Sequence, residues 1–315
     1  MTGVARDKFR RTPPCGVDCV AGVASSTRWA TFQSVPVARC QGESRGEVHM
    51  GIGNRVLGGC VAVLCALGLV GTPQGAVAAE EDRGRVLVAG GTGGTGRHVV
   101  AELLEQGYSV RVLSRSAESV RNAFGDTVEA VEGDVRDAAT LVAALEEVRW
   151  VISTIGSSGR ADPANSPEAV DYRGVRNLVE AAVASGSVEQ FVLVSSMGIT
   201  QPTHPLNRFA NNILLWKGLG ENALRFSGLA YTIVRPGGLI DEPGGQGAIM
   251  VGQGDTMAQG RIPRADVARV SVAALGREAA VRRTFEIVVD SAGEPAAVET
   301  VFEGLEPDSE TRIGG

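Results

Sequence analysis

The sequence has 315 residues, of which 43% are hydrophobic, with 30 Lys and Arg against 36 Asp and Glu and a formal net charge of −6. This is the composition of a globular protein, and its negative balance excludes a general nucleic-acid-binding surface, which needs clustered positive charge. All five cysteines lie at or before Cys65 and only two histidines follow it, so the rest of the chain is expected to hold no disulfide framework, no metal site and no cysteine nucleophile.

Residues 1–79 are predicted to be a targeting leader. Residues 1–49 carry seven basic and four acidic residues without apolar periodicity. The hydrophobic segment 56–71 follows Arg55 and precedes the small residues 76–79, which is the order of a signal peptide. Its 16 residues are fewer than the roughly 20 of a spanning helix. We therefore expect cleavage after Ala78 or Ala79; an uncleaved anchor is the alternative, and it would be the protein's contact with a membrane.

Two cellular locations are consistent with this leader. If translation starts at Met50, the segment stands at the N-terminal position of a signal peptide and the protein is exported to a periplasm. If it starts at Met1, a basic leader ahead of a signal-like segment indicates an organelle-targeted protein. A cytoplasmic location is the alternative to both.

Residues 80–315 are predicted to form a single α/β domain. With 1–79 left out, 22 basic and 32 acidic residues remain, a formal charge of −10. Apolar strand signals alternate with helix signals, which predicts a doubly wound parallel sheet covered on both faces. We expect strands at 85–89, 110–113, 128–131, 151–154, 191–194, 231–234 and 285–289, helices at 98–106, 138–147, 167–185, 213–226 and 266–275, and a long Gly-rich loop at 237–260.

A glycine-rich segment between the first strand and the first helix predicts phosphate binding. Glycines at GxxGxxG spacing let the backbone turn tightly and bring its amides up to a diphosphate at the start of a helix. The position after a strand and before a helix supplies the context that a lone glycine motif lacks. The residues expected to bind a dinucleotide here are Gly90, Thr92, Gly93, Gly94, Thr95 and Gly96.

The ends of the second and third strands bear on the choice of cofactor. Arg115 stands where an NAD-preferring site places an acidic residue, and a guanidinium there suits the 2′-phosphate of NADP(H). An ordinary solvated arginine is the alternative. Asp134 and Val135 follow the third strand; Asp134 is expected either near the adenine amino group or as the N-cap of the helix starting near Ala138.

Several motifs together resemble one family. They are GGTGGTG at 90–96, Ser-Arg-Ser at 114–116, Gly-Asp-Val at 133–135, and the segments 151–156, 171–177, 194–197 and 235–239. In this order they resemble the atypical short-chain dehydrogenase/reductases of the NmrA-like, NAD(P)-binding kind, over about residues 84–290. The resemblance implies a Rossmann-like domain that binds NADP(H), with Ser195, Ser196 and Lys217 near the nicotinamide and with Pro236 and Gly237 lining the pocket.

Lys217 also stands out by composition, because residues 80–315 contain 21 arginines and this single lysine. A compact ammonium reaches ribose hydroxyls in a narrow site where a forked guanidinium does not fit. The resemblance breaks four residues earlier, where Ile213 replaces the tyrosine of the Tyr-x-x-x-Lys pair and removes its phenol as a proton donor. The substitute donors are Ser196, Tyr172, Tyr231, His204 and Lys217 itself.

Two functions follow from these features. The first is an NADP(H)-dependent oxidoreductase that reduces a small organic carbonyl or alkene, with Lys217, Ser195 and Ser196 as catalytic residues. The second is a non-catalytic NADP(H)-binding redox sensor or assembly factor. Ile213 favours the second, and the Gly-rich pocket segment 237–254 favours the first.

Overall fold

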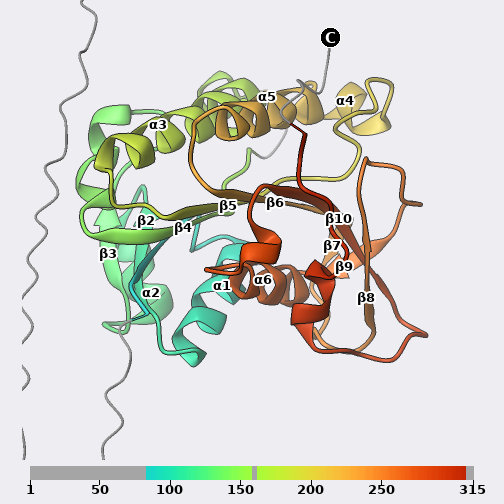
Figure 1. Cartoon of the computed structure of the whole chain (residues 1–315). Coiled ribbons are helices and arrows are strands. Elements are labelled where there is room, and N and C mark those ends of the chain that lie inside the picture. Colours follow the sequence, from blue (N-terminus) through green and yellow to red (C-terminus); the bar gives the residue numbers. More distant parts are fainter. Residues whose placement is uncertain (1–82, 158–161, 310–315) are drawn as a thin grey trace, which may run out of the picture. The chain divides into compact units, whose positions relative to one another are not determined.

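An eight-stranded sheet forms the middle of the structure, a computed structural model that describes residues 83–157 and 162–309 (Figure 1). The predicted leader, 1–79, lies outside the described residues. The strand order is β3-β2-β1-β4-β5-β6-β10-β8, and β7 and β9 form a separate parallel pair. The strands are β1 Arg85–Ala89, β2 Ser109–Ser114, β3 Glu129–Glu132, β4 Val148–Ser153, β5 Gln190–Val194, β6 Tyr231–Pro236, β7 Gly238–Ile240, β8 Ala248–Gly252, β9 Arg261–Pro263 and β10 Arg283–Asp290.

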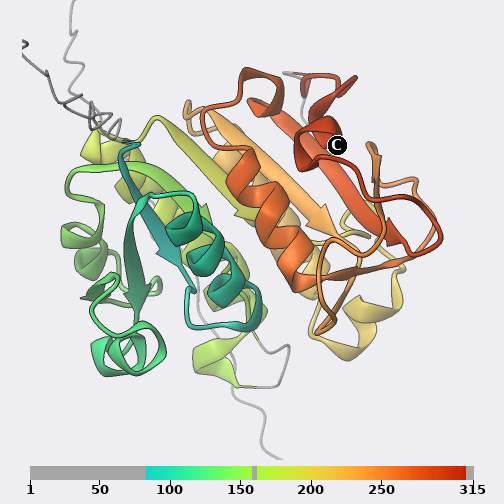
Figure 2. The ribbon, with the colours of Figure 1, turned by 90° about the horizontal axis from the view of Figure 1, so that it is seen from below.

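Helices cover both faces of this sheet, with α3 and α5 on one side and α1 and α6 on the other (Figures 1 and 2). The central strands are mostly apolar because neither face meets water; all of β5 and β6 is buried. The α-helices are α1 Gly94–Glu105, α2 Ala117–Phe124, α3 Val175–Ser185, α4 Pro205–Phe209, α5 Ile213–Arg225 and α6 Arg264–Ala273. Short 3₁₀ segments lie at 138–141, 143–145, 163–165, 278–280 and 298–302, and a π-helix spans Glu168–Gly174.

The order 3-2-1-4-5-6 is the doubly wound arrangement, and the prediction of a Rossmann-like single domain is confirmed. The first seven strands of the sheet order run parallel, and each predicted strand lies within two residues of an observed one, except that β4 begins three residues earlier, at Val148. In such a sheet the chain reverses its direction of winding between β1 and β4. A cleft opens there at the carboxyl ends of the strands, and this is where ligands bind.

Two predicted segments differ from the structure. The segment 237–260 is not one long loop: it contains β7 and β8, and β8 pairs antiparallel with β10, so the sheet is not wholly parallel. The helix predicted at 138–147 is two 3₁₀ turns instead. The buried Arg111 side chain accounts for this, because its Nη1 donates to the carbonyl oxygens of Ala144 at 3.1 Å and Glu146 at 2.7 Å and holds them away from helical geometry.

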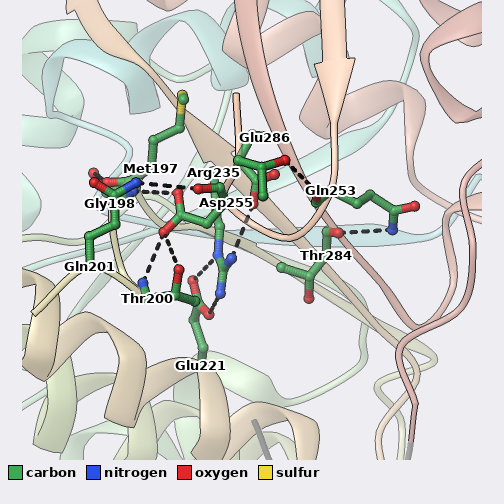
Figure 3. A network of polar contacts seen from close by, with 12 residues as sticks. Met197, Gly198, Thr200, Gln201, Glu221, Arg235, Gln253, Asp255, Thr284 and Glu286 are labelled. Carbon is green, nitrogen blue, oxygen red and sulfur yellow. Dashed lines mark hydrogen bonds and ion pairs between the residues drawn. The ribbon is translucent and has the colours of Figure 1, made fainter. Parts of the chain in front are cut away.

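A buried ionic network ties α5 to β6 and β10 (Figure 3). Arg235 donates from Nε to Glu221 Oε1 at 3.0 Å, from Nη2 to Glu221 Oε2 at 2.7 Å and from Nη1 to Glu286 Oε1 at 3.1 Å. Arg225 adds a contact to Glu221 at 2.9 Å. Burial alone would raise the pKa of Glu221, but the two arginines outweigh it and hold that pKa below its usual value. Burial raises the pKa of Glu286 above its usual range.

We expect Glu221→Gln to lower the free energy of unfolding by about 3 kcal/mol at pH 7, because it leaves two buried guanidinium groups short of negative charge. A carboxyl whose pKa is lower folded than unfolded stabilises above its unfolded pKa. The difference should therefore shrink as the pH falls below the unfolded value of 4.5. Urea unfolding at pH 7 and pH 4 measures both effects.

The matched control is Glu180→Gln, which breaks an exposed pair with Arg176 on α3 and should change stability by less than about 0.5 kcal/mol at either pH. Equal losses in the two variants, or a Glu221→Gln loss that does not depend on pH, would contradict the assignment.

Candidate functional site

The glycine-rich turn after β1 presents free backbone amides at the start of α1. Gly93 is the N-cap, and its N–H donates to Gly90 O at 2.9 Å. The first helical bond is from Arg97 N–H to Gly93 O at 3.0 Å, so the amides of Gly94, Thr95 and Gly96 precede it. With the positive end of the helix dipole behind them, these amides form an anion-binding site.

Two of the glycines are required for this geometry. Gly90 has φ of +84°, a conformation that residues with a side chain rarely adopt. A Cβ on Gly96 would overlap the carbonyl oxygen of Gly90, and it would lie 2.7 Å from the Cα of Gly91. The first turn of α1 therefore packs directly on the backbone that leaves β1.

Two adjoining cavities occupy the carboxyl ends of the strands. The first has a volume of about 650 Å³ and the second about 360 Å³. Thr154, Ile155 and Gly156, which follow β4, line both of them, so the cavities form one cleft. The second cavity lies over the glycine turn and the ends of β2 and β3, and the first lies beyond β5 and β6. We name the two cavities after the roles proposed for them below: the second is the adenosine cavity and the first is the reaction cavity.

The adenosine cavity holds six of the predicted cofactor residues: Gly90, Thr92, Gly93, Arg115, Asp134 and Val135. Arg115 is exposed and makes no hydrogen bond or ion pair with another described residue, so its guanidinium is available to a ligand. The hydroxyl-bearing residues Ser114, Ser116 and Ser119 line the cavity around it; Ser116 caps α2 through a bond from Ser119 N–H at 3.2 Å. The sequence reasoning missed Ser119, which sits one turn into a helix that was not predicted.

Asp134 does not cap the following helical turn, because that role belongs to Asp137, whose side chain accepts from Ala139 N–H at 3.1 Å. Asp134 instead accepts from Arg136 Nε at 2.9 Å, and this guanidinium holds the pKa of Asp134 below its usual range. The carboxylate is thus ionised and paired. Val135 contributes to the adenosine cavity, and its carbonyl oxygen accepts from Asn177 Nδ2 at 2.9 Å.

The reaction cavity holds the other predicted residues. They are Thr95, Ser195, Ser196, Lys217, Pro236 and Gly237, contributed by α1, by α5 and by the segments that follow β5 and β6. Of the predicted cofactor residues only Gly94 and Gly96 line neither cavity: Gly94 starts α1 against the Arg264 side chain, and Gly96 is buried in the turn.

Lys217 is fixed by an acidic partner that the sequence reasoning did not single out. Its Nζ lies 2.8 Å from Asp171 Oδ1, and the Asp171 side chain is completely buried. Asp171 Oδ2 accepts the N–H of Ser157 at 3.1 Å. The carboxylate therefore links the helical segment before α3 to the turn after β4 and points the lysine into the cleft beside Gly156. Asp171 belongs to the 171–177 motif, but only its ion pair with Lys217 indicates that it positions the lysine.

The structure separates the substitute proton donors. Ser196, His204 and Lys217 line the reaction cavity, whereas Tyr172 and Tyr231 do not. Tyr231 donates its hydroxyl to Asp308 Oδ2 at 2.9 Å, and burial raises the pKa of that phenol. His204 accepts from Leu206 N–H through Nδ1 at 3.2 Å, which leaves Nε2 as the ring nitrogen that can donate.

Asp255 holds the segment between β5 and α4 that carries part of the cavity wall (Figure 3). This residue is 4% exposed, and its carboxylate accepts from Gly198 N–H at 2.6 Å, Thr200 N–H at 2.9 Å and Thr200 Oγ1 at 2.9 Å. Asp255 has φ of +59° and lies in the segment that was predicted to be a loop. It fixes the backbone that follows Met197, which lines the cavity.

Two further findings concern residues 83–157 and 162–309. No helix in these ranges is both long and apolar enough to cross a membrane. No three His, Cys, Asp or Glu side chains in them gather as the ligands of a metal ion would.

Comparison with known proteins agrees with this geometry. The family model described as NAD(P)H-binding matches residues 90–278. Sanguinarine reductase of Eschscholzia californica is 33% identical over 241 residues, covering 64% of this chain and 88% of its own length. A chloroplastic protein of Arabidopsis thaliana, At2g37660, is 38% identical over 224 residues, covering 64% of this chain and 68% of its own. The chain belongs to the NAD(P)H-binding family, and the predicted resemblance to NAD(P)-binding reductases is confirmed.

A solved structure gives the same result for the fold. A Bacillus halodurans protein described as a candidate NAD-dependent epimerase/dehydratase superposes with a TM-score of 0.61 at 26% identity, over 70% of this chain and 99% of its own. The cradle of the glycine turn and the unpaired Arg115 fit such a dinucleotide, so the cofactor class is settled as NAD(P)H, while the choice of NADP(H) stays a prediction.

Gly96→Ala tests the cradle. A methyl group directed at the Gly90 carbonyl must push α1 away from the turn, so the dissociation constant for NADPH should rise at least about tenfold. Titration of NADPH fluorescence measures it. Ala101→Gly is the control, because it weakens the same helix by about 1 kcal/mol at an exposed position without touching the turn. Unchanged NADPH affinity in Gly96→Ala would show that the amides do not hold the diphosphate.

Proposed function

We propose that this protein is an NADPH-dependent reductase that transfers a hydride to an organic carbonyl or to an alkene conjugated with one. The observation that carries the proposal is the continuous cleft, in which the adenosine cavity of about 360 Å³ joins a cavity of about 650 Å³ lined by Lys217, Ser195, Ser196 and His204. A cofactor-only site needs no such space beyond the nicotinamide, whereas a reductase needs room for a second molecule there.

The residues of the reaction cavity would have different roles in the proposed reaction. The bound cofactor supplies the hydride. Lys217, held by Asp171, would donate hydrogen bonds from its ammonium to the nicotinamide ribose and to the reacting oxygen. Ser195 and Ser196 line the same cavity. The hydroxyl of Ser196 donates to Met197 O at 3.0 Å and that of Ser195 interacts with Glu221, so each hydroxyl would have to turn to donate to the reacting oxygen. The proton that balances the hydride comes from a donor other than residue 213, which is isoleucine, and His204 presents an Nε2–H on the cavity wall.

NADP(H) is the proposed form of the cofactor. Arg115 is unpaired and is accompanied by the serines at 114, 116 and 119, which together present a cation and hydroxyl donors around the place of a 2′-phosphate. The domain is otherwise strongly acidic, so a free arginine at this position supports recognition of an added phosphate rather than a general positive surface.

The second candidate is a redox sensor or assembly factor that binds NADP(H) without turnover. Ile213 favours it, because the usual phenol donor is missing. The two candidates share the cofactor site and differ only in whether the reaction cavity performs chemistry.

For location we propose an organelle. The basic leader ahead of the segment 56–71 supports this, and so does the relative named as chloroplastic, since NADPH is an intracellular cofactor. Export to a periplasm stays the alternative drawn from the same segment. Sequencing of the mature N-terminus from the source organism tests processing, and an intact Met1 would contradict it.

Arg115→Asp tests cofactor choice. Removal of the guanidinium and addition of a negative charge should weaken NADPH binding roughly tenfold to a hundredfold and leave NADH binding within about threefold. Calorimetric titration with both dinucleotides measures the switch. Arg121→Asp on α2 is the charge-matched control outside both cavities. If the wild-type protein binds NADH as tightly as NADPH, the assignment of NADP(H) fails.

Lys217→Ala tests the reductase. Oxidation of NADPH with a panel of aromatic ketones, quinones and enones should lose at least about a hundredfold in kcat/KM. Lys217→Arg should not restore it, since a planar guanidinium does not reproduce the compact ammonium that pairs with Asp171. Asp171→Asn should reduce kcat while the protein stays folded. Tight NADPH binding without turnover of any compound, unaffected by these variants, would favour the sensor.

A further inference from the structure

The reaction cavity differs in charge from the rest of the domain. Residues 80–315 carry a formal charge of −10, yet no Asp or Glu side chain lines this cavity. Its ionisable lining residues are Lys217, His204 and Arg261. A site built for a cationic substrate would place a carboxylate on its wall, and the many acidic residues of the domain lie elsewhere.

Of these three groups, Arg261 is the one with unused charge. The Nζ of Lys217 forms an ion pair with Asp171 Oδ1 at 2.8 Å. The Nδ1 of His204 accepts a hydrogen bond from the backbone N–H of Leu206. Arg261 is exposed and forms no hydrogen bond or ion pair with any other described residue. Three residues further on, Arg264 does find a partner, Asp241 at 2.8 Å, so an unpaired guanidinium is not the rule in this segment.

Arg261 lies away from the side where the cofactor enters. It begins β9, where it pairs with Gly238 of β7. It also lines a third cavity of about 280 Å³, which shares no residue with the adenosine cavity; Glu242 and Asp266 line that third cavity as well, but neither forms an ion pair with Arg261. The segment 154–156 marks the cofactor side of the reaction cavity instead. Gly238 and Arg261 lie side by side, since a Cβ on Gly238 would be 3.6 Å from Arg261 Cγ, an ordinary contact distance.

The lining also provides an apolar surface. Ile155, Val194 and Met197 line it, and Leu206 and Leu239 remain 44% and 38% exposed, so the cavity presents aliphatic surface that no part of the described chain covers. A ligand that lies on these residues buries apolar area, and a negatively charged end of the same ligand can form paired charge-assisted bonds with the Arg261 guanidinium.

We infer that the substrate is an apolar molecule with an acidic group, a carboxylate or a similar oxyanion, that binds Arg261 while its reducible carbon faces the cofactor. That this ligand is a substrate with a reducible carbon rests on the proposed reductase function. The preference for an acidic apolar ligand rests on the cavity itself. Arg261 is then the residue that selects the charge of the ligand, and it takes no part in hydride transfer.

Three probes that share one planar ketone separate charge from shape: fluorenone carboxylate, its methyl ester, and (aminomethyl)fluorenone, which is a cation at neutral pH. Their affinities are measured by calorimetry on the full chain saturated with NADP⁺, where no turnover is possible. We expect the carboxylate to bind at least about tenfold more tightly than the ester or the amine. In Arg261→Gln the carboxylate should fall to the level of the ester, with NADPH affinity unchanged; Arg121→Gln should keep the wild-type order.

The results distinguish this inference from the proposed function. Equal binding of acid and ester, no measurable binding of the acid, or a preference for the acid that survives Arg261→Gln overturns the inference. Weaker NADPH binding in Arg261→Gln also overturns it, because the arginine would then serve the cofactor. If the acid is preferred through Arg261 but NADPH is not oxidised by any of the three ketones, the ligand class holds and the reductase proposal fails for them. Equal oxidation of all three supports a reductase and rejects the charge selection.

Discussion

The close approach of α1 to the end of β1 is the constraint on which the site depends. Gly96 lies against the Gly90 carbonyl, where any side chain would overlap, and this contact places the first amides of the helix at the mouth of the cleft. The winding of the sheet adds the rest, because it brings the carboxyl ends of β1, β2, β3 and β4 to the same edge. A dinucleotide can then lie across four strands, with its charged centre over backbone amides and its two ends over side chains that specify chemistry.

Charge is segregated in this molecule. Carboxylates that lie behind the cleft are neutralised by their own partners, Asp171 by Lys217 and Glu221 by two arginines, so their charge serves to orient side chains. The face that the substrate meets carries no acid and one uncommitted guanidinium. An acidic domain can therefore hold both an anionic cofactor and an anionic ligand, because local groups determine binding over a few ångströms and salt screens the distant negative charge.

With isoleucine at residue 213, the side chains on the cavity wall that can donate a proton come from other positions. The segment between β5 and α4 brings His204 to the cavity wall. It is held in place by hydrogen bonds to Asp255, which follows β8 (Figure 3). Asp255 connects in turn to Glu286 and Arg235 through the same network that ties α5 to the sheet. The lysine on α5 and the donors after β5 are thus parts of one rigid assembly, in which a buried charge moves only at a large energetic cost.

The sequence by itself determined the doubly wound fold, the glycine turn, the positions of the seven parallel strands and most of the residues that were found to line the two cavities, because hydrophobic periodicity and glycine spacing are local properties of the chain. It did not determine β8, since a short edge strand is stabilised by its neighbour β10 rather than by its own pattern, nor the 3₁₀ turns at 138–145, which Arg111 holds from another strand. Asp171, Asp255 and the unpaired Arg261 came only from tertiary structure. Asp171 has a charged partner, Asp255 accepts hydrogen bonds from the backbone, and Arg261 has no ion pair with another described residue. These differences depend on contacts between residues that are tens of positions apart in the sequence.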